Sequence, residues 1–352
     1  YDSNGDNGHI LLEPTSTNLF RYSEDINSNS FSKIGTSIES NVTTSPDGTL
    51  NADLLKEDNQ SGSHFIYKDM SVSSGQDYTI SLFAKSNGVN RDLKFGDGGV
   101  GWSSGFSVNF DLSEGTATSG GVIESYGNGW YRCSVTGTTN ATTARLIIYC
   151  TLNGTTSYSG DNVSGLFLWG MQLEALSYAT SYIPNHGTAV GVTRATETLN
   201  GSGNSTLINT TEGTIYLESK LLNTTGTKLF SIGAGTNNAD PAVLVGYAGS
   251  NMYFDFIDGS SLVSSPVDLR NQGAVSTDSY NKMAVSYTST SVTVFLNGVK
   301  KVTKSGVDFT PTNSLKSLYA GYGTGSKFEG EVKALAVVNE ALSDTELANL
   351  TS

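Results

Sequence analysis

The sequence predicts an all-β protein: two tandem β-sandwich (jelly-roll) domains with one short C-terminal helix. At 352 residues the chain is too long for one ordinary hydrophobic core. Gly is frequent, with 40 residues, and Pro is scarce, with 6, in a background rich in Ser, Thr and Asn. That composition suits short strands joined by tight turns. Segments in which apolar residues alternate with polar ones recur along the chain, which is typical of half-buried strands.

The first half of the chain contains a series of short strand-like segments. They follow one another at intervals of about ten residues, with turn signals between them, which indicates a sandwich. One turn, Ser45–Thr49, has Asp47 and Gly48 at its centre. The predicted strands are 10–12, 17–22, 31–38, 52–56, 64–68, 78–85, 91–95, 105–111, 116–119, 122–126, 130–137 and 144–151.

The segment Leu166–Leu173 marks the end of the first domain. It is apolar on both faces, which indicates a strand buried on both sides. The chain then leaves the sheet through turn residues around Pro184 and becomes rich in Gly, Ser, Asn and Thr. The predicted organisation is a polar lead at 1–8, a first domain at 9–195, a linker at 196–204 and a second domain at 205–352.

Alternation is clearer in the second half of the chain. Asn297-Gly298 predicts a type I′ hairpin between two strands. Ser343 and Glu346 form a capping box flanked by Leu342 and Leu347 as a hydrophobic staple, so one short helix should end the chain. The predicted strands are 214–220, 228–232, 242–247, 252–257, 281–287, 292–296, 299–303, 314–322 and 330–339.

Charge and hydropathy exclude several classes of partner. The formal charge is −13, and no basic cluster exceeds Lys300–Lys301, so we expect no nucleic-acid partner. No apolar run approaches membrane length, so we expect no membrane insertion. Cys133 and Cys150 either pair across neighbouring strands or stay separate as buried thiols. The chain opens on a polar segment without a start Met, and we expect a processed product or an excised C-terminal part.

Four segments of the second domain resemble a known superfamily. In order they are 281–287, 294–299, 330–339 and 341–347, and the likeness extends over residues 205–352. This set resembles the laminin-G/concanavalin-A-like lectin superfamily. The resemblance implies a jelly roll of two sheets.

The first domain has its own set of characteristic segments. They are 12–19, 22–25, 45–49, 128–132, 168–174, 181–184 and 193–195, and the likeness extends over residues 9–195. They resemble the carbohydrate-binding-module-like jelly rolls of bacteriophage head and tail fibres. The resemblance implies a virion surface location, with host-surface polysaccharide and other virion proteins as partners. It leaves the oligomeric state open, a homotrimer being one option.

Aromatic side chains are the first candidates for a sugar site, because their faces stack on the apolar faces of sugar rings. Trp102 lies in a Gly-rich loop with little apolar company, and Asp97 beside it could hold hydroxyl groups. Tyr126 is a second aromatic candidate. The competing interpretation of Trp102 is a side chain that folds back and caps the sandwich. A buried core role is favoured for the aromatic residues in strand-like segments, Trp130, Tyr131 and Trp169.

Metal binding and catalysis find less support. Related jelly rolls often carry a structural calcium ion near the chain ends, and Glu24, Asp25 and Glu174 supply hard oxygen donors. Solvated surface carboxylates are the competing interpretation, since Gly170 stands where related modules often place carboxylates. The Glu-x-Asp-x-x-Glu pattern of concanavalin-like glucanases does not occur in the sequence. We therefore expect no enzyme activity and no other cofactor.

The sequence leaves three functions open. The leading one is a phage virion fibre or decoration protein that displays glycan-binding sandwiches for host-surface attachment. The second is a set of accessory binding modules from a secreted polysaccharide-degrading enzyme. The third is a structural virion component without a ligand.

Overall fold

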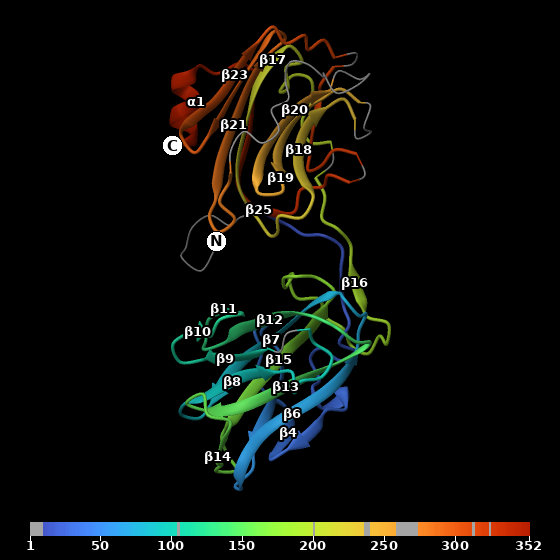
Figure 1. The fold of residues 1–352 in the computed structure, drawn as a ribbon, viewed down its shortest axis with the longest axis vertical. Coiled ribbons are helices and arrows are strands. Elements are labelled where there is room, and N and C mark those ends of the chain that lie inside the picture. The colour runs from blue at the N-terminus through green and yellow to red at the C-terminus, as the bar shows by residue number, and fades with distance from the viewer. Residues whose placement is uncertain are drawn as a thin grey trace. The chain divides into compact units, whose positions relative to one another are not determined.

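The computed structural model describes residues 10–103, 106–199, 201–235, 240–257, 274–311, 314–323 and 325–352. The predicted polar lead at 1–8 lies outside these residues. The chain folds into two compact units, one formed by residues 15–195 and the other by residues 196–352 with the segment that ends at Pro14. We call them the N-terminal and the C-terminal sandwich. The all-β prediction is confirmed, with one α-helix among the described residues (Figure 1).

The N-terminal sandwich consists of two antiparallel sheets. The first, which we call the β6 sheet, has the order β10-β9-β8-β13-β6-β14, and β3 also pairs with β6. Its strands are β3 (Ser32–Ile34), β6 (Ser61–Ser71), β8 (Arg91–Gly96), β9 (Ser107–Asp111), β10 (Thr116–Ala117), β13 (Thr143–Leu152) and β14 (Ser157–Ser159).

The second sheet, the β7 sheet, has the order β11-β12-β7-β15-β5-β4. A 3-10 turn (Asn27–Asn29) precedes β3, and a small ladder joins β2 (Ser16–Asn18) to β16 (Val192–Arg194). The strands of the β7 sheet are β4 (Thr36–Thr44), β5 (Leu50–Glu57), β7 (Asp77–Asn87), β11 (Gly121–Ser125), β12 (Tyr131–Thr138) and β15 (Gly165–Glu174).

Alternation along the strands decides which side chains form the core between these sheets. Ile66 and Ile148 from the β6 sheet pack in one cluster with Ile80 and Leu168 from the β7 sheet, all fully buried. Neighbouring residues in each strand point to the opposite face of their sheet. The residues that alternate with these core residues therefore make up the outer face of each sheet, and some of them are aromatic.

The outer face of the β7 sheet is covered by the chain itself. Phe83, Trp130 and Trp169 form a second buried cluster there, and Tyr182 packs against it. Trp130 and Trp169 are 3% exposed, which confirms the predicted burial, and Tyr131 is half-buried against the main core.

A bulge in β15 shapes this cluster. The register of β15 against β7 shifts between Trp169 and Gln172. Gly170, inside the bulge, has a φ of 64°, and a Cβ there would lie 2.7 Å from a ring carbon of Phe83. Only glycine avoids both the left-handed backbone strain and this clash.

The C-terminal sandwich also has two sheets. Their orders are β1-β25-β17-β21-β22-β23 and β20-β19-β18-β24. Ile215, Phe254 and Val294 are among the fully buried residues of its core. The strands are β1 (Ile10–Leu12), β17 (Glu212–Leu221), β18 (Thr227–Gly233), β19 (Ala242–Ala248), β20 (Asn251–Ile257), β21 (Asn281–Thr288), β22 (Ser291–Leu296), β23 (Val299–Ser305), β24 (Ser317–Tyr319) and β25 (Gly330–Val338).

The predicted C-terminal helix is confirmed as α1 (Asp344–Thr351). The Ser343 backbone N–H donates to the Glu346 carboxylate at 2.8 Å, and the Ser343 hydroxyl accepts from the Glu346 N–H at 3.5 Å. Leu342 and Leu347 belong to the same apolar cluster, which packs the helix against β17, β21 and β22. The capping box and the staple thus fix where the helix begins.

The first strand of the chain corrects the predicted first domain, 9–195. Ile10–Leu12 pairs with β25 of the C-terminal sandwich, with Ile10 opposite Val332, and Leu12 packs in that core. Glu13 and Glu197 also pair, since the Glu197 N–H donates to the Glu13 carbonyl oxygen at 3.0 Å. Pairing with a distant strand edge is a tertiary interaction that a local sequence pattern does not encode.

The two cysteines are separate buried thiols. Cys133 lies on β12 and Cys150 on β13, which belong to different sheets, and both are free. Burial raises the pKa of Cys150 to about 12 and also raises the pKa of Cys133. The alternative of a cross-strand disulfide is wrong. Among the described residues, no helix has the length and apolar character needed to cross a membrane.

Candidate functional site

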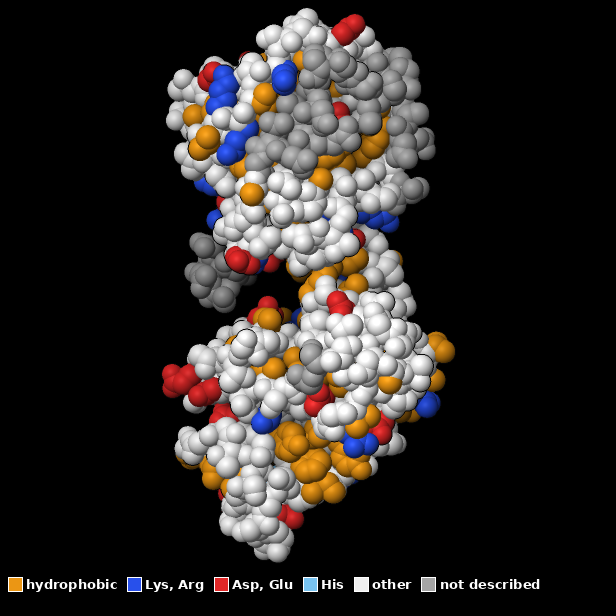
Figure 2. All heavy atoms as spheres, viewed as in Figure 1, with side chains coloured by type: hydrophobic (Ala, Val, Ile, Leu, Met, Phe, Trp, Pro, Cys, Tyr) orange, Lys and Arg blue, Asp and Glu red, His pale blue; other side chains and the backbone are white. Residues whose placement is uncertain are grey.

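Aromatic side chains lie on the outer face of the β6 sheet and remain partly open. His64 and Ile66 of β6 point into the sandwich, so Phe65 and Tyr67 lie on the opposite face. On β13, Leu146 and Ile148 are in the core, which places Tyr149 on the same outer face. Phe65, Tyr67 and Tyr149 are each half-buried, and we call them the aromatic row. Figure 2 shows hydrophobic side chains gathered over β6 and β13.

The rings of the aromatic row contact one another. The centroids of Phe65 and Tyr149 lie 4.9 Å apart, and those of Phe65 and Tyr67 lie 6.2 Å apart. A Cβ on Gly96 of β8 would lie 3.2 Å from a ring carbon of Tyr149. The ring of Tyr149 therefore lies over β8, in space that a larger residue at position 96 would fill.

An ion pair borders the row on one side. Arg145 donates two hydrogen bonds to the Asp69 carboxylate, at 2.7 and 2.9 Å, and its guanidinium lies 4.8 Å from the ring centroid of Tyr67. The hydrogen bond from Arg145 lowers the pKa of Asp69. The cation–π contact and the bidentate pair hold the Tyr67 ring in position.

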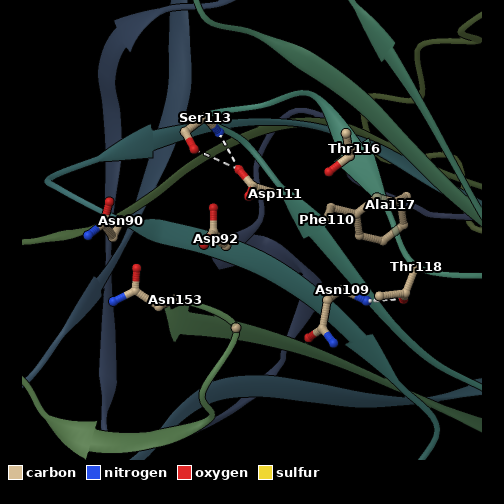
Figure 3. A pocket seen from close by; sticks show the side chains of 11 residues that line it. Asn90, Asp92, Asn109, Phe110, Asp111, Ser113, Thr116, Ala117, Thr118 and Asn153 are labelled. Atoms are coloured by element: carbon tan, nitrogen blue, oxygen red, sulfur yellow. Dashed lines mark hydrogen bonds between the residues drawn. The ribbon is translucent and has the colours of Figure 1, made fainter.

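A polar cavity of about 390 Å³ lies on the same sheet, at β8, β9 and β10 (Figure 3). Figure 3 shows the amides of Asn90 and Asn153 on one side of Asp92, and Asn109 with Thr118 on the other. The strand register connects the cavity to the aromatic row, because Tyr149 pairs with Lys94 and Lys94 pairs with Asn109. The cavity is lined by Asn90, Asp92, Asn109, Phe110, Asp111, Ser113, Thr116, Ala117, Thr118, Asn153 and Gly154.

The two carboxylates of the cavity differ in their surroundings. Asp92 is buried and accepts one hydrogen bond from the Leu112 N–H at 3.0 Å, and burial raises its pKa. Asp111 accepts from the Glu114 N–H at 2.9 Å and from the backbone and side chain of Ser113, which lowers its pKa. Asp111 thus stays ionised and closes the turn after β9.

The side-chain oxygen of Asn109 is a hydrogen-bond acceptor that lacks a donor among the described residues. Its backbone N–H donates to the Thr118 hydroxyl at 3.0 Å. Its side-chain Oδ1 is buried, and no group among the described residues donates to it. A buried carbonyl oxygen left unpaired costs about 1–3 kcal/mol, so a ligand hydroxyl that donates here would recover this energy.

Taken together, these groups suit a ligand with an apolar ring face and many hydroxyls. The aromatic row offers flat apolar surface, and the cavity offers carboxylate and amide oxygens as acceptors with Asn and Ser/Thr groups as donors. Groups of these kinds can hold such a ligand by stacking and hydrogen bonds.

The prediction that Trp102 is an exposed platform is wrong. Trp102 is 6% exposed, and its Nε1–H donates to the Arg145 carbonyl oxygen at 2.9 Å. Its ring meets Phe106 edge to face at 4.9 Å and lies against Gly137, where a Cβ would be 2.8 Å from the indole. The missing side chain at Gly137 makes room for the indole, so Trp102 caps the sandwich, as the competing interpretation held.

The other two predicted ligand residues lie apart from each other. Asp97 closes its own loop, accepting from the Gly99 N–H at 3.0 Å and the Phe106 N–H at 3.1 Å. It borders the aromatic row, since its charge adds to burial in raising the pKa of Tyr149. Tyr126 is 49% exposed but stacks edge-on against Phe83 of the β7 sheet.

The predicted metal ligands do not form one site. Glu174 is fully buried and accepts hydrogen bonds from Ser16 and Thr180. Glu24 accepts from Tyr182 and Asn51, and Asp25 accepts from the backbone and side chain of Ser28.

Glu24 and Asp25 line a separate cavity of about 350 Å³ that does not include Glu174. Among the described residues no group of three or more acidic, His or Cys side chains could hold a metal ion. The structure does not bring Glu174 together with Glu24 and Asp25, because Glu174 binds Ser16 and Thr180 instead. Calcium binding itself stays a prediction.

Sequence reasoning missed the aromatic row itself. Its members lie in the predicted strands 64–68 and 144–151, both of which the structure confirms. Each strand has apolar or aromatic residues on both faces, so alternation alone did not separate the core face from the outer face. The polar neighbours on the outer face, such as Asp69 and Lys94, were the available signal.

Comparisons with known proteins bear on the C-terminal sandwich and on the fold. Residues 196–348 match the Laminin_G_3 family, described as the concanavalin A-like lectin/glucanases superfamily. The match covers less than half of the chain and shows that this part of it is similar to that superfamily. No curated protein sequence matches the chain.

Three solved structures are similar to parts of the chain. A carbohydrate-binding module of a Ruminococcus gnavus sialidase, bound to α2,3-sialyllactose, is 20% identical; the match covers 44% of this chain and 98% of that one, with a TM-score of 0.36. Domain 4 of a Geobacillus stearothermophilus arabinanase, in complex with arabinotriose, is 21% identical; the match covers 47% of this chain and 79% of that one, with a TM-score of 0.35. Domains LG4–5 of the mouse laminin α1 chain are 13% identical; the match covers 82% of this chain and 92% of that one, with a TM-score of 0.27.

Proposed function

We propose that this protein binds glycans and that the outer face of the β6 sheet is a binding surface. One observation carries the proposal: a half-buried aromatic row is continuous with a polar cavity on one face of one sheet. Aromatic rings on a protein surface stack on sugar rings, and the cavity's donors and acceptors match sugar hydroxyls.

The dimensions of this face favour an oligosaccharide over a single sugar. The register runs from Phe65 through Tyr149 and Lys94 to Asn109, one residue on each of four neighbouring strands. Strands lie about 4.8 Å apart, so this row spans about 15 Å. A glycan chain would cross the strands, with one sugar in the cavity and the following sugars on the aromatic row.

The proposed activity is binding without cleavage. Glycoside hydrolysis uses two carboxyl groups that are free to act on either side of one bond. Asp111 is held by backbone and side-chain donors in its own turn. Asp92 therefore has no second free carboxyl group beside it in the cavity. We expect no release of reducing ends from bacterial or marine polysaccharides, and turnover that is lost in Asp92→Asn would contradict this.

The proposed setting is the surface of a bacteriophage, on a head or tail fibre or a decoration protein. What supports it is the set of segments in the N-terminal sandwich, among them 128–132 and 168–174, that resemble fibre modules. Individual glycan contacts are weak, and many copies on a virion would raise the effective affinity. The alternative is a pair of accessory modules from a polysaccharide-degrading enzyme, which the lectin/glucanase match of residues 196–348 also allows.

Binding is tested with a multimerised full-length chain on a glycan array and on bacterial cells. Tyr67→Ala/Tyr149→Ala should weaken adsorption about tenfold or more, since each stacking contact contributes about 1 kcal/mol. Tyr126→Ala is the matched control, because Tyr126 is a solvent-accessible tyrosine that contacts Phe83 of the β7 sheet and not the aromatic row. Equal adsorption of the double variant and the control would contradict the proposal.

The setting needs a separate test. Antibody labelling of purified phage particles should detect the protein on virions. Its detection only in culture supernatant, in one chain with a glycosidase, would favour the accessory-module alternative.

A further inference from the structure

Lys94 occupies the position between the aromatic row and the polar cavity. It lies opposite Tyr149 of β13 on one side and opposite Asn109 of β9 on the other. Its neighbours Leu93 and Phe95 are fully buried, so the Lys94 side chain is on the outer face, where it is half-buried. A ligand that spans the row and the cavity must pass this ammonium group.

The other charged groups of this face are already engaged. Asp69 and Arg145 pair with each other, and Asp97 accepts from two backbone N–H groups of its own loop. Asp92 of the same strand and Asp111 of β9 accept from the backbone around the cavity. Among the described residues, Lys94 has no ion-pair partner.

We infer that Lys94 makes this face selective for acidic glycans, with the carboxylate of a uronic or similar sugar bound to its ammonium group. The inference rests on the proposed glycan-binding function of the same face. A charge-assisted hydrogen bond to a carboxylate is about twice as strong as one between neutral groups. The sugar ring that carries this carboxylate stacks on Tyr149, the aromatic residue directly opposite Lys94.

The charges in the cavity restrict which sugar can enter it. Asp92 and Asp111 give it two carboxyl groups, and the ionised Asp111 repels a second anionic sugar. The sugar that enters the cavity is therefore uncharged or carries an amino group, and it presents a hydroxyl to the unpaired Asn109 oxygen. The matching ligand alternates acidic with uncharged sugars and is not a polymer of acidic sugars alone.

Three probes test this inference on the full-length protein by calorimetry. They are hyaluronan oligosaccharides, which alternate a uronate with a neutral N-acetylated sugar, chitin oligosaccharides, which are neutral, and oligogalacturonate, which is acidic throughout. The hyaluronan probe should bind best. Lys94→Gln should weaken its binding about tenfold and flatten its salt dependence, since one charged contact is lost.

Two further variants, Lys94→Arg and Tyr149→Ala, separate the possible failures. Lys94→Arg should retain hyaluronan binding, because it keeps the charge, and Lys94→Gln should leave chitin oligosaccharide binding and the melting temperature unchanged. If Tyr149→Ala abolishes binding of all probes while Lys94→Gln changes nothing, the role of Lys94 is overturned and the proposed function stands. If chitin oligosaccharides bind and hyaluronan does not, the selectivity for acidic glycans is overturned and the proposed function stands. If no probe binds, or if neither variant changes the binding of any probe, both are overturned.

Discussion

The two sheets of the N-terminal sandwich both carry aromatic residues on their outer faces, but these residues are buried on one face and half-buried on the other. On the β7 sheet, Phe83, Trp130 and Trp169 are buried. On the β6 sheet, Phe65, Tyr67 and Tyr149 are half-buried. The strands of both sheets alternate in the same way. The difference is that the chain after β15 folds back over one face, while in the described part of the chain no segment covers the other.

Specific hydrogen bonds fix that covering segment. The Ile183 N–H donates to the side chain of Gln172 at 2.7 Å, and the Thr180 N–H donates to Glu174 at 3.0 Å. The Thr79 hydroxyl donates to the Leu176 carbonyl oxygen at 2.8 Å. Buried polar groups with satisfied partners hold a segment in one place. An aromatic residue on an outer strand face is thus a binding candidate only where no such segment follows.

The largest expected effect is on the covered face. Trp169→Ala should destabilise the N-terminal sandwich by about 3–5 kcal/mol, because it leaves a cavity among buried aromatic rings. Tyr149→Ala, on the open face, should cost less than about 1.5 kcal/mol. Urea unfolding of both variants measures the contrast, and equal destabilisation would remove the distinction between the faces.

A second substitution tests the corrected position of Trp102. Trp102→Ala should destabilise the protein by about 3 kcal/mol, since the indole packs on Phe106 and donates to a backbone carbonyl. Thermal unfolding followed by circular dichroism measures the loss. An unchanged melting temperature together with weaker glycan binding would restore the original prediction of an exposed platform.

Removing an anchor of the covering segment should have a smaller effect. Glu174→Ala removes a buried acceptor that three donors share and should cost about 1–3 kcal/mol. Hydrogen exchange should rise in residues 175–185 and stay unchanged in β6 and β13. Uniformly faster exchange in both sheets would mean that Glu174 supports the whole fold and not this segment.

The smallest expected effect is on the pH dependence of stability, and it comes from a carboxylate in a turn, Asp161. Donors from Ser164 and Val163 lower the pKa of Asp161, so its stabilising contribution is present above the usual value of 3.8 and is lost as pH falls below it. Asp92 has a raised pKa and opposes this trend. Asp161→Asn should lower the melting temperature slightly at pH 7 and reduce its decline between pH 4 and about pH 2. An unchanged acid profile would contradict this assignment.

Much of the fold could be predicted from local patterns. The doubly apolar segment 166–173 is β15, the Asn297-Gly298 turn joins β22 to β23, and the capping box begins α1. These features depend on residues a few positions apart. β1 was misplaced because its partner β25 lies more than 300 residues away.

The candidate site was harder to predict for the same reason. Trp102 stands in a Gly-rich loop that suggests exposure, but Gly137 on a distant strand provides the space that buries it. The aromatic row is assembled from β6 and β13, and it is open because no segment among the described residues covers it. A strand pattern identifies which side chains share a face and leaves open what covers that face.

The most direct test of the account is to locate a bound glycan on the full-length protein. Backbone amide chemical shifts should be recorded by NMR during titration with the oligosaccharide that binds best on the array. Shifts concentrated at Phe65, Tyr67, Lys94 and Tyr149 are the predicted result. Shifts concentrated around Phe83, Tyr126 and Trp169, with none on β6 and β13, would contradict the claim that the open face of the β6 sheet binds the ligand.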